Sequence, residues 1–137
     1  MIVEGYAALF GVEDHMRDIV RAGAFATSLK RRAEPLPMLL EHDPRLLAGR
    51  WTDVREDARG LWLLGEIRDD LPGAARARRA IARGVDGLSI GFVPLAQHRS
   101  GAYRVLTEIE LLEVSIVTHP MQPHARLTLA RELVRAA

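Results

Sequence analysis

The sequence contains no cysteine, so the chain can form neither a disulfide framework nor a thiolate metal site. It also lacks an excess of either charge: Lys plus Arg total 19 and Asp plus Glu total 18. This balance does not favour nucleic acid or a membrane surface as a partner. No apolar run is long enough to cross a bilayer, and the first residues lack the basic and apolar regions of a signal peptide. We therefore expect a cytosolic domain with no membrane contact and no specific nucleic-acid partner.

The chain does have enough apolar residues to form a core, since 48% of its 137 residues are hydrophobic. We expect one domain over residues 1–125 and a C-terminal helix or tail over residues 126–137. Trp51 and Trp62 are expected in the core. The patterns predict strands at 2–10, 38–41, 46–54, 60–67, 88–93 and 103–118, and helices at 26–32 and 70–83. In the second helix Asp70 is the expected N-cap.

One hydroxyl lies in the middle of an apolar, glycine-flanked run, Gly87-Leu88-Ser89-Ile90-Gly91. If this run is a strand, Ser89 points away from the core, and the two glycines leave it in an open notch. Such a notch suits an attacking serine, but the pattern also fits a half-buried strand with a bend or bulge, and taken alone it favours that simpler structure. The run matches the G-x-S-x-G nucleophile elbow, yet a continuing strand follows instead of the required helix, so we exclude the elbow.

Two further residues could complete a catalytic group with the serine. His42 ends a short apolar strand just before an Asp-Pro turn, where it could act as a base or merely cap the turn. Glu113 is the single charge in the apolar run 111–117, and a buried carboxylate needs a partner such as a histidine. Nucleophile, base and acidic orienter are then all present. Glu108 and Glu110 are expected to face solvent.

The remaining polar residues suggest simpler roles. Asp43 adjoins the histidine but precedes a proline, so we expect it to shape the turn. His119 and His124 could bind a metal, but no third ligand lies at a recognisable spacing. The sequence therefore predicts neither a metal nor a cofactor.

Four pieces of the chain, in this order and spacing, resemble the tailed-phage prohead (capsid maturation) protease family, which is related in fold to herpesvirus assemblin. They are Gly23-Ala24-Phe25 with Ser28-Leu29, the stretch 39–43, the stretch 84–92, and the stretch 110–118 before Pro120. The resemblance covers nearly the whole chain up to about Ala125. It implies an α+β, mainly β fold: a compact antiparallel β-barrel flanked by helices.

The resemblance also implies a function. It implies a serine endopeptidase that cleaves extensions of the major capsid protein or of the scaffold inside the immature capsid of a phage or of a phage-like particle. This enzyme would act in the host cytoplasm as a homodimer. His42 matches the family's base, Ser89 its nucleophile, and Glu113 the third member, which is a histidine in the herpesvirus relatives. Those relatives also carry an arginine pair that helps form the oxyanion site, whereas Arg126 stands alone here.

Two other functions stay open from the sequence. The same fold could serve as an inactive capsid-assembly scaffold module whose catalytic group has degraded. A small esterase or amidase is the third possibility. The presence of all three catalytic residue types favours the active endopeptidase.

Overall fold

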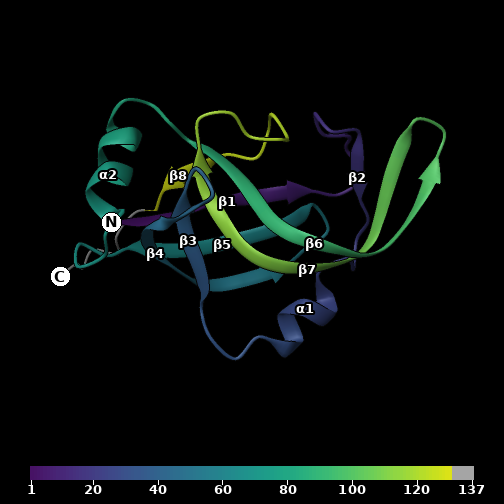
Figure 1. The fold of residues 1–137 in the computed structure, drawn as a ribbon, viewed down its shortest axis with the longest axis horizontal. Helices are drawn as coiled ribbons and strands as arrows, with labels where there is room; N and C mark the ends of the chain where they lie inside the picture. Colours follow the sequence, from purple (N-terminus) through teal and green to yellow (C-terminus); the bar gives the residue numbers. More distant parts are fainter. Residues whose placement is uncertain (131–137) are drawn as a thin grey trace.

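The computed structural model of the chain describes residues 1–130, and these form mostly strand (Figure 1). No helix in this range is long and apolar enough to span a membrane. In chain order the elements are β1 (Ile2–Leu9), β2 (Asp18–Val20), α1 (Ala26–Arg31), β3 (Leu36–Leu40), β4 (Asp43–Glu56), β5 (Gly60–Ile67), α2 (Ala74–Ala82), β6 (Gly87–Ser100), β7 (Tyr103–Val117) and β8 (Leu127–Leu129).

The strands form one 8-stranded sheet in the order β2-β7-β3-β4-β5-β1-β8, and β6 pairs with the other edge of β7. The sheet curls into a half-barrel, and the hairpin of β6 and β7 extends away from it as an arm (Figure 1). The mainly β, barrel-like fold predicted from the sequence is confirmed. The sheet is not wholly antiparallel, because β2 and β3 both run parallel to β7.

The first residues of β6 are tied to the segment that leads into β8, which brings the two ends of the sheet together. The N–H of Leu88 donates to the carbonyl of Ala125 at 2.9 Å, and the N–H of Leu127 donates to that of Asp86 at 2.7 Å. Strand β8 then pairs with β1. Residues 127–129, which the sequence placed in a helix or tail, are therefore a strand of the sheet, and residues 131–137 lie outside the described range.

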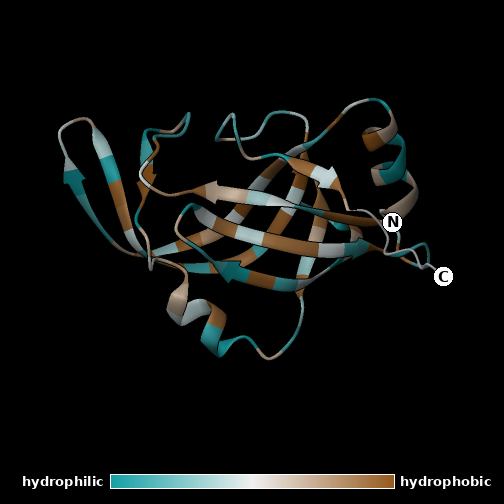
Figure 2. Ribbon diagram, turned by 180° about the vertical axis from the view of Figure 1, so that it is seen from behind, coloured by the Kyte–Doolittle hydropathy of each residue, from teal (hydrophilic) through white to brown (hydrophobic). Residues whose placement is uncertain are grey.

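The core lies inside the curl and consists of side chains that alternate along the strands. Along several strands in Figure 2, brown hydrophobic residues alternate with white or teal residues of intermediate or low hydropathy. This is the pattern of strands with one face buried. Trp51 is 1% exposed, and its indole N–H donates to the carbonyl of Val114 at 3.1 Å. Trp62 is only half-buried, contrary to expectation, because it lies on the outside of the sheet. There the guanidinium of Arg55 covers its ring.

Helix α2 is shorter than the sequence predicts. It begins at Ala74 with Gly73 as its N-cap residue, so Asp70 does not cap it. The N–H of Gly73 donates to the carbonyl of Leu47 in β4 at 2.8 Å, and this bond holds the preceding segment in turns. The C-terminal end of α2 is as expected. The chain leaves the helix at Gly84, whose φ of 99° is a conformation that glycine adopts readily.

Candidate active site

A one-residue bulge in the pairing of β6 with β7 decides which side chains face outward. Phe92 pairs with Leu111 and Gly91 with Glu113, so Leu112 has no residue directly opposite it. Side chains alternate strictly along a strand, and an extra residue reverses the alternation beyond it.

The reversal is visible in the burial of β7. Leu111 and Val114 are both fully buried although they are three positions apart, an odd spacing that would place them on opposite faces of a regular strand. Glu113 and Ser115 consequently share the opposite, outward face. Without the bulge, Glu113 would continue the inward series and enter the apolar core.

The turn between β3 and β4 is the second positioning device, and it carries His42. Leu40 pairs with Asp43, so the turn has only two residues, Glu41 and His42, with φ values of 52° and 59°. Both values belong to the left-handed region used by two-residue hairpin turns, where glycine and asparagine are the usual residues. The conformation costs about 1–2 kcal/mol for each residue with a side chain.

Hydrogen bonds to the end of β7 offset this cost. The carboxylate of Glu41 accepts the N–H of Thr118 at 2.9 Å and its hydroxyl at 2.7 Å. The N–H of Glu41 donates to the carbonyl of Ile116 at 3.0 Å, and the N–H of His42 donates to the hydroxyl of Ser115 at 2.9 Å. The turn is thereby fixed above the outward face of β7.

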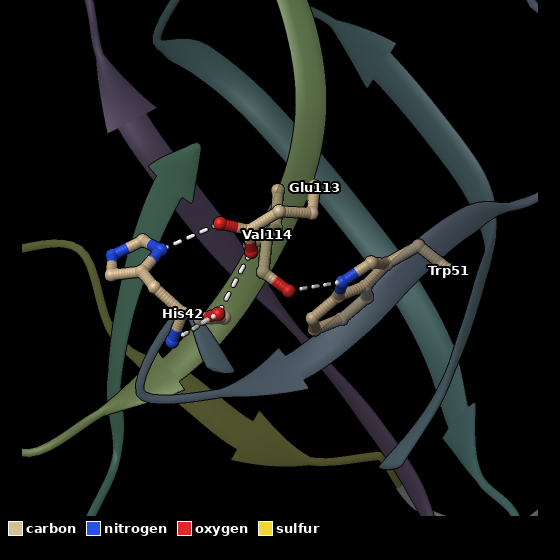
Figure 3. Close-up of polar contacts among 5 residues, drawn as sticks. His42, Trp51, Glu113 and Val114 are labelled. Carbon is tan, nitrogen blue, oxygen red and sulfur yellow. Dashed lines mark hydrogen bonds and ion pairs between the residues drawn. The ribbon is translucent and has the colours of Figure 1, made fainter. Parts of the chain in front are cut away.

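His42 and Glu113 meet on this face. The imidazole Nδ1 lies 2.6 Å from Glu113 Oε2, as Figure 3 shows, and the other carboxylate oxygen accepts the hydroxyl of Ser115 at 2.8 Å. The side chain of Glu113 is 12% exposed and that of His42 is 43% exposed. The hydrogen bond with Glu113 raises the pKa of His42 above its ordinary value, the charge of Glu41 adds to the rise, and burial opposes it.

Ser89 lies on the neighbouring strand, on the same face. It pairs directly with Ser115, two positions along β6 from the Gly91 pair with Glu113. Directly opposed residues share a face. The structure thus brings His42 and Glu113 into contact and places Ser89 one strand away. Among residues 1–130, no hydrogen bond joins the Ser89 hydroxyl to His42.

The expected open notch around the serine is partly filled. Ser89 is 4% exposed, and Glu113 occupies the space beside Gly91, where an added Cβ would overlap Glu113 Oε2. A cavity of about 240 Å³ between β1 and β6 includes Ser89, Ala8 and Ile90 in its lining, but in the described range neither His42 nor Glu113 lines it.

The other residues considered from the sequence lie elsewhere. Asp43 binds the guanidinium of Arg45, which lowers the pKa of that carboxyl. Glu110 lies 3.8 Å from Arg31. Glu108 is half-buried at the side of the arm and is not among the hydrogen-bond partners of His42 in the described range.

The polar residues after β7 do not join the site either. No group of three or more metal-ligating side chains occurs in the described part of the chain, and both His119 and His124 are exposed. Arg126 is held by Asp86 at 2.7 Å.

Two residues of the site were not found from the sequence. Ser115 follows Glu113 by two positions, a spacing that shares a strand face, and this signal was available. Glu41 carried no such signal, because its role depends on a turn conformation that its residue type does not favour.

Comparison with known proteins identifies the family. The family model described as caudovirus prohead serine protease matches residues 1–136. The chain belongs to the caudovirus prohead serine protease family. The prohead protease of Enterobacteria phage HK97 is 32% identical over 129 residues, which make up 90% of this chain but 57% of that protein. The chain therefore spans little more than half the length of this relative.

Two solved structures of viral proteases share the fold of this chain. The bacteriophage T4 capsid assembly protease superposes with a TM-score of 0.69 at 16% identity, covering 85% of this chain and 80% of that one. The KSHV protease, solved with a hexapeptide phosphonate inhibitor, gives 0.67 at 18% identity, covering 96% of this chain and 65% of that one. The predicted relationship to the prohead proteases and to the herpesvirus fold is confirmed.

The contact between Gly91 and Glu113 provides a test of the geometry. We expect Gly91→Ala to fold but to push the carboxylate of Glu113 away from His42, because the new methyl group would overlap Oε2. The pKa of His42 should then fall toward its ordinary value of 6.5 in an NMR titration. Val93→Ala alters an exposed side chain on the same strand and is the control. An unchanged titration of His42 in Gly91→Ala would contradict the geometry.

Proposed function

We propose that the chain is a serine endopeptidase of capsid maturation, with Ser89 as nucleophile, His42 as general base and Glu113 as the residue that orients the base. The observation that carries the proposal is the 2.6 Å contact of His42 with Glu113 on the face that Ser89 shares, in a member of a serine protease family. A carboxylate on Nδ1 fixes the tautomer and leaves Nε2 to accept a proton.

The chemistry follows from these roles. The Ser89 oxygen attacks the scissile carbonyl carbon while its proton passes to His42 Nε2. The imidazolium, stabilised by Glu113, then gives this proton to the leaving amine as the C–N bond breaks. Water repeats the sequence on the acyl-enzyme and releases the new carboxyl end. Ser89 and His42 are not hydrogen-bonded in the free enzyme, and such bonds often tighten only when substrate binds.

The shape of the site favours a peptide over a small ester as the substrate. Beyond Leu88, the edge of β6 that faces away from β7 pairs with no strand among residues 1–130. An extended peptide can add to such an edge through main-chain hydrogen bonds. The substrates we infer are extensions of the major capsid protein or of the scaffold, cleaved inside the immature capsid in the host cytoplasm.

The alternative, an inactive assembly module of the same fold, is less well supported. Two residues with side chains are held in an unfavourable turn conformation, and that turn carries His42. Backbone strain of this kind persists where the surrounding structure maintains it, and it clusters at active sites. A degraded catalytic group would not need it.

Removing the nucleophile and the base tests the proposal directly. We expect Ser89→Ala and His42→Ala to fold and to abolish cleavage of a capsid-protein peptide in single-turnover assays. The double variant should be no slower than either single variant, because residues of one catalytic unit are not additive. A fluorophosphonate probe should label the wild type at Ser89. Cleavage that persists in Ser89→Ala would exclude this nucleophile.

The role of Glu113 predicts a specific pH dependence. The base form of His42 is neutral and its pKa is raised, so kcat/KM should be high above this pKa and fall below it. Glu113→Gln removes the charge, so turnover should drop about a hundredfold. The acid limb of the profile should also move to lower pH, toward 6.5. Glu108→Gln is the matched control and should change neither. A lower melting temperature with normal turnover would instead make Glu113 a structural residue.

The proposal includes a homodimer, which rests on the likeness to the herpesvirus proteases. We expect light scattering to show a dimer at high protein concentration and a monomer on dilution, with activity per molecule falling in parallel. A monomer with constant specific activity across the whole series would refute it.

A further inference from the structure

The hydroxyl of Ser115 joins the two residues that the proposed mechanism requires to act together. It accepts the main-chain N–H of His42 at 2.9 Å and donates to Glu113 Oε1 at 2.8 Å. Ser115 is 0% exposed. The proposed chemistry assigns it no step.

A serine hydroxyl has one proton to donate and two lone pairs. The proton is used on Glu113, so the orientation of this hydroxyl is set by the carboxylate. A lone pair receives the N–H of His42. The main chain that carries the base and the carboxylate that orients it are therefore bound to the same oxygen atom.

Both oxygens of the Glu113 carboxylate are committed as a result. Oε1 is bound by Ser115 and Oε2 by His42 Nδ1. With one oxygen held, rotation of the carboxylate would break a bond, so the other oxygen stays directed at the imidazole. Losing the hydroxyl would free this rotation.

The turn of His42 needs the same hydroxyl for a second reason. The φ of His42 is 59°, a conformation that requires support from its surroundings. Glu41 secures its own half of the turn through Thr118. On the His42 side, Ser115 is the partner of the main-chain N–H.

We propose that Ser115 is a positioning residue of the active site, which acts through His42 and Glu113 by fixing the imidazole and the carboxylate relative to each other. The proposal rests on the function proposed above. Misplacing a reacting group by about 1 Å can cost a hundredfold in rate.

The experiment compares Ser115→Ala with Ser28→Ala. Ser28 is a matched control: it is 3% exposed, and its hydroxyl likewise accepts a main-chain N–H, that of Leu111 at 2.9 Å. Each variant is measured for kcat, for KM, for melting temperature and for the pKa of His42 by NMR. Ser115→Thr keeps the hydroxyl and serves as the rescue.

We expect Ser115→Ala to lower kcat at least about tenfold with KM unchanged, and to lower the pKa of His42 toward 6.5. Ser28→Ala should lower the melting temperature but leave kcat and the pKa of His42 as in the wild type. Ser115→Thr should restore both quantities. If Ser115→Ala fails to fold, Ser115→Cys replaces it, because a thiol has a similar shape but is a weak hydrogen-bond donor. We expect Ser115→Cys to lower kcat and the pKa of His42 by smaller amounts.

Two results would overturn the proposal. One is a Ser115→Ala variant whose kcat and whose pKa of His42 both equal those of the wild type. The other is a change in melting temperature alone, as in Ser28→Ala. The titration of His42 does not depend on cleavage, so the two proposals can fail separately. If the wild type cleaves no peptide but Ser115→Ala still lowers the pKa of His42, the endopeptidase is refuted and the positioning of His42 and Glu113 by Ser115 is supported.

Discussion

The bulge at Leu112 is the constraint on which the rest of the site depends. Before the bulge, the odd-numbered positions of β7, Ile109 and Leu111, point into the core. After the bulge, the even-numbered positions, Val114 and Ile116, do so. Glu113 can then lie within a run of apolar residues without entering the barrel. An unpaired carboxylate inside the core would cost several kcal/mol or more. A single extra residue thus makes an acidic group compatible with a buried strand.

The site combines features that each work against stability. The turn of Glu41 and His42 uses a backbone conformation that their side chains disfavour. Position 91, where Glu113 fills the space that a side chain would need, must be a glycine, and a glycine in a strand interior weakens the strand. Hydrogen bonds to the end of β7 compensate the cost of the turn, so the same contacts that position His42 also maintain the strained hairpin.

Much of this arrangement could be predicted from the sequence, because alternation and glycine patterns are local. The strands at residues 2–10 and 60–67, the short helix at 26–32, and the pairing of His42 with Glu113 were all predicted, and the structure agrees with them. Ser89 was predicted as the nucleophile, and it shares the face of the pair without contacting it.

The errors have physical causes that a local pattern does not contain. Strand β2 has three residues, and it is a strand only because β7 lies beside it. The bulge depends on the register between two strands, and the run 111–117 gives no sign of it. Trp62 was placed in the core by its type, but its position on the outside of the sheet was decided by strand pairing. Helix α2 loses its expected first turn because the N–H of Gly73 donates to a carbonyl of β4, which is distant in sequence.

The length of the turn that carries His42 has a consequence for how the gene can vary. A two-residue connection with both residues in the left-handed region admits no insertion, since a third residue would change the turn type and redirect the imidazole. The tip of the β6–β7 arm, at Gly101 and Ala102, is exposed and contributes nothing to the site. Length variation among homologous genes should therefore collect at the arm and be absent from the hairpin, so that the contact of His42 with Glu113 stays fixed while the length of the arm evolves.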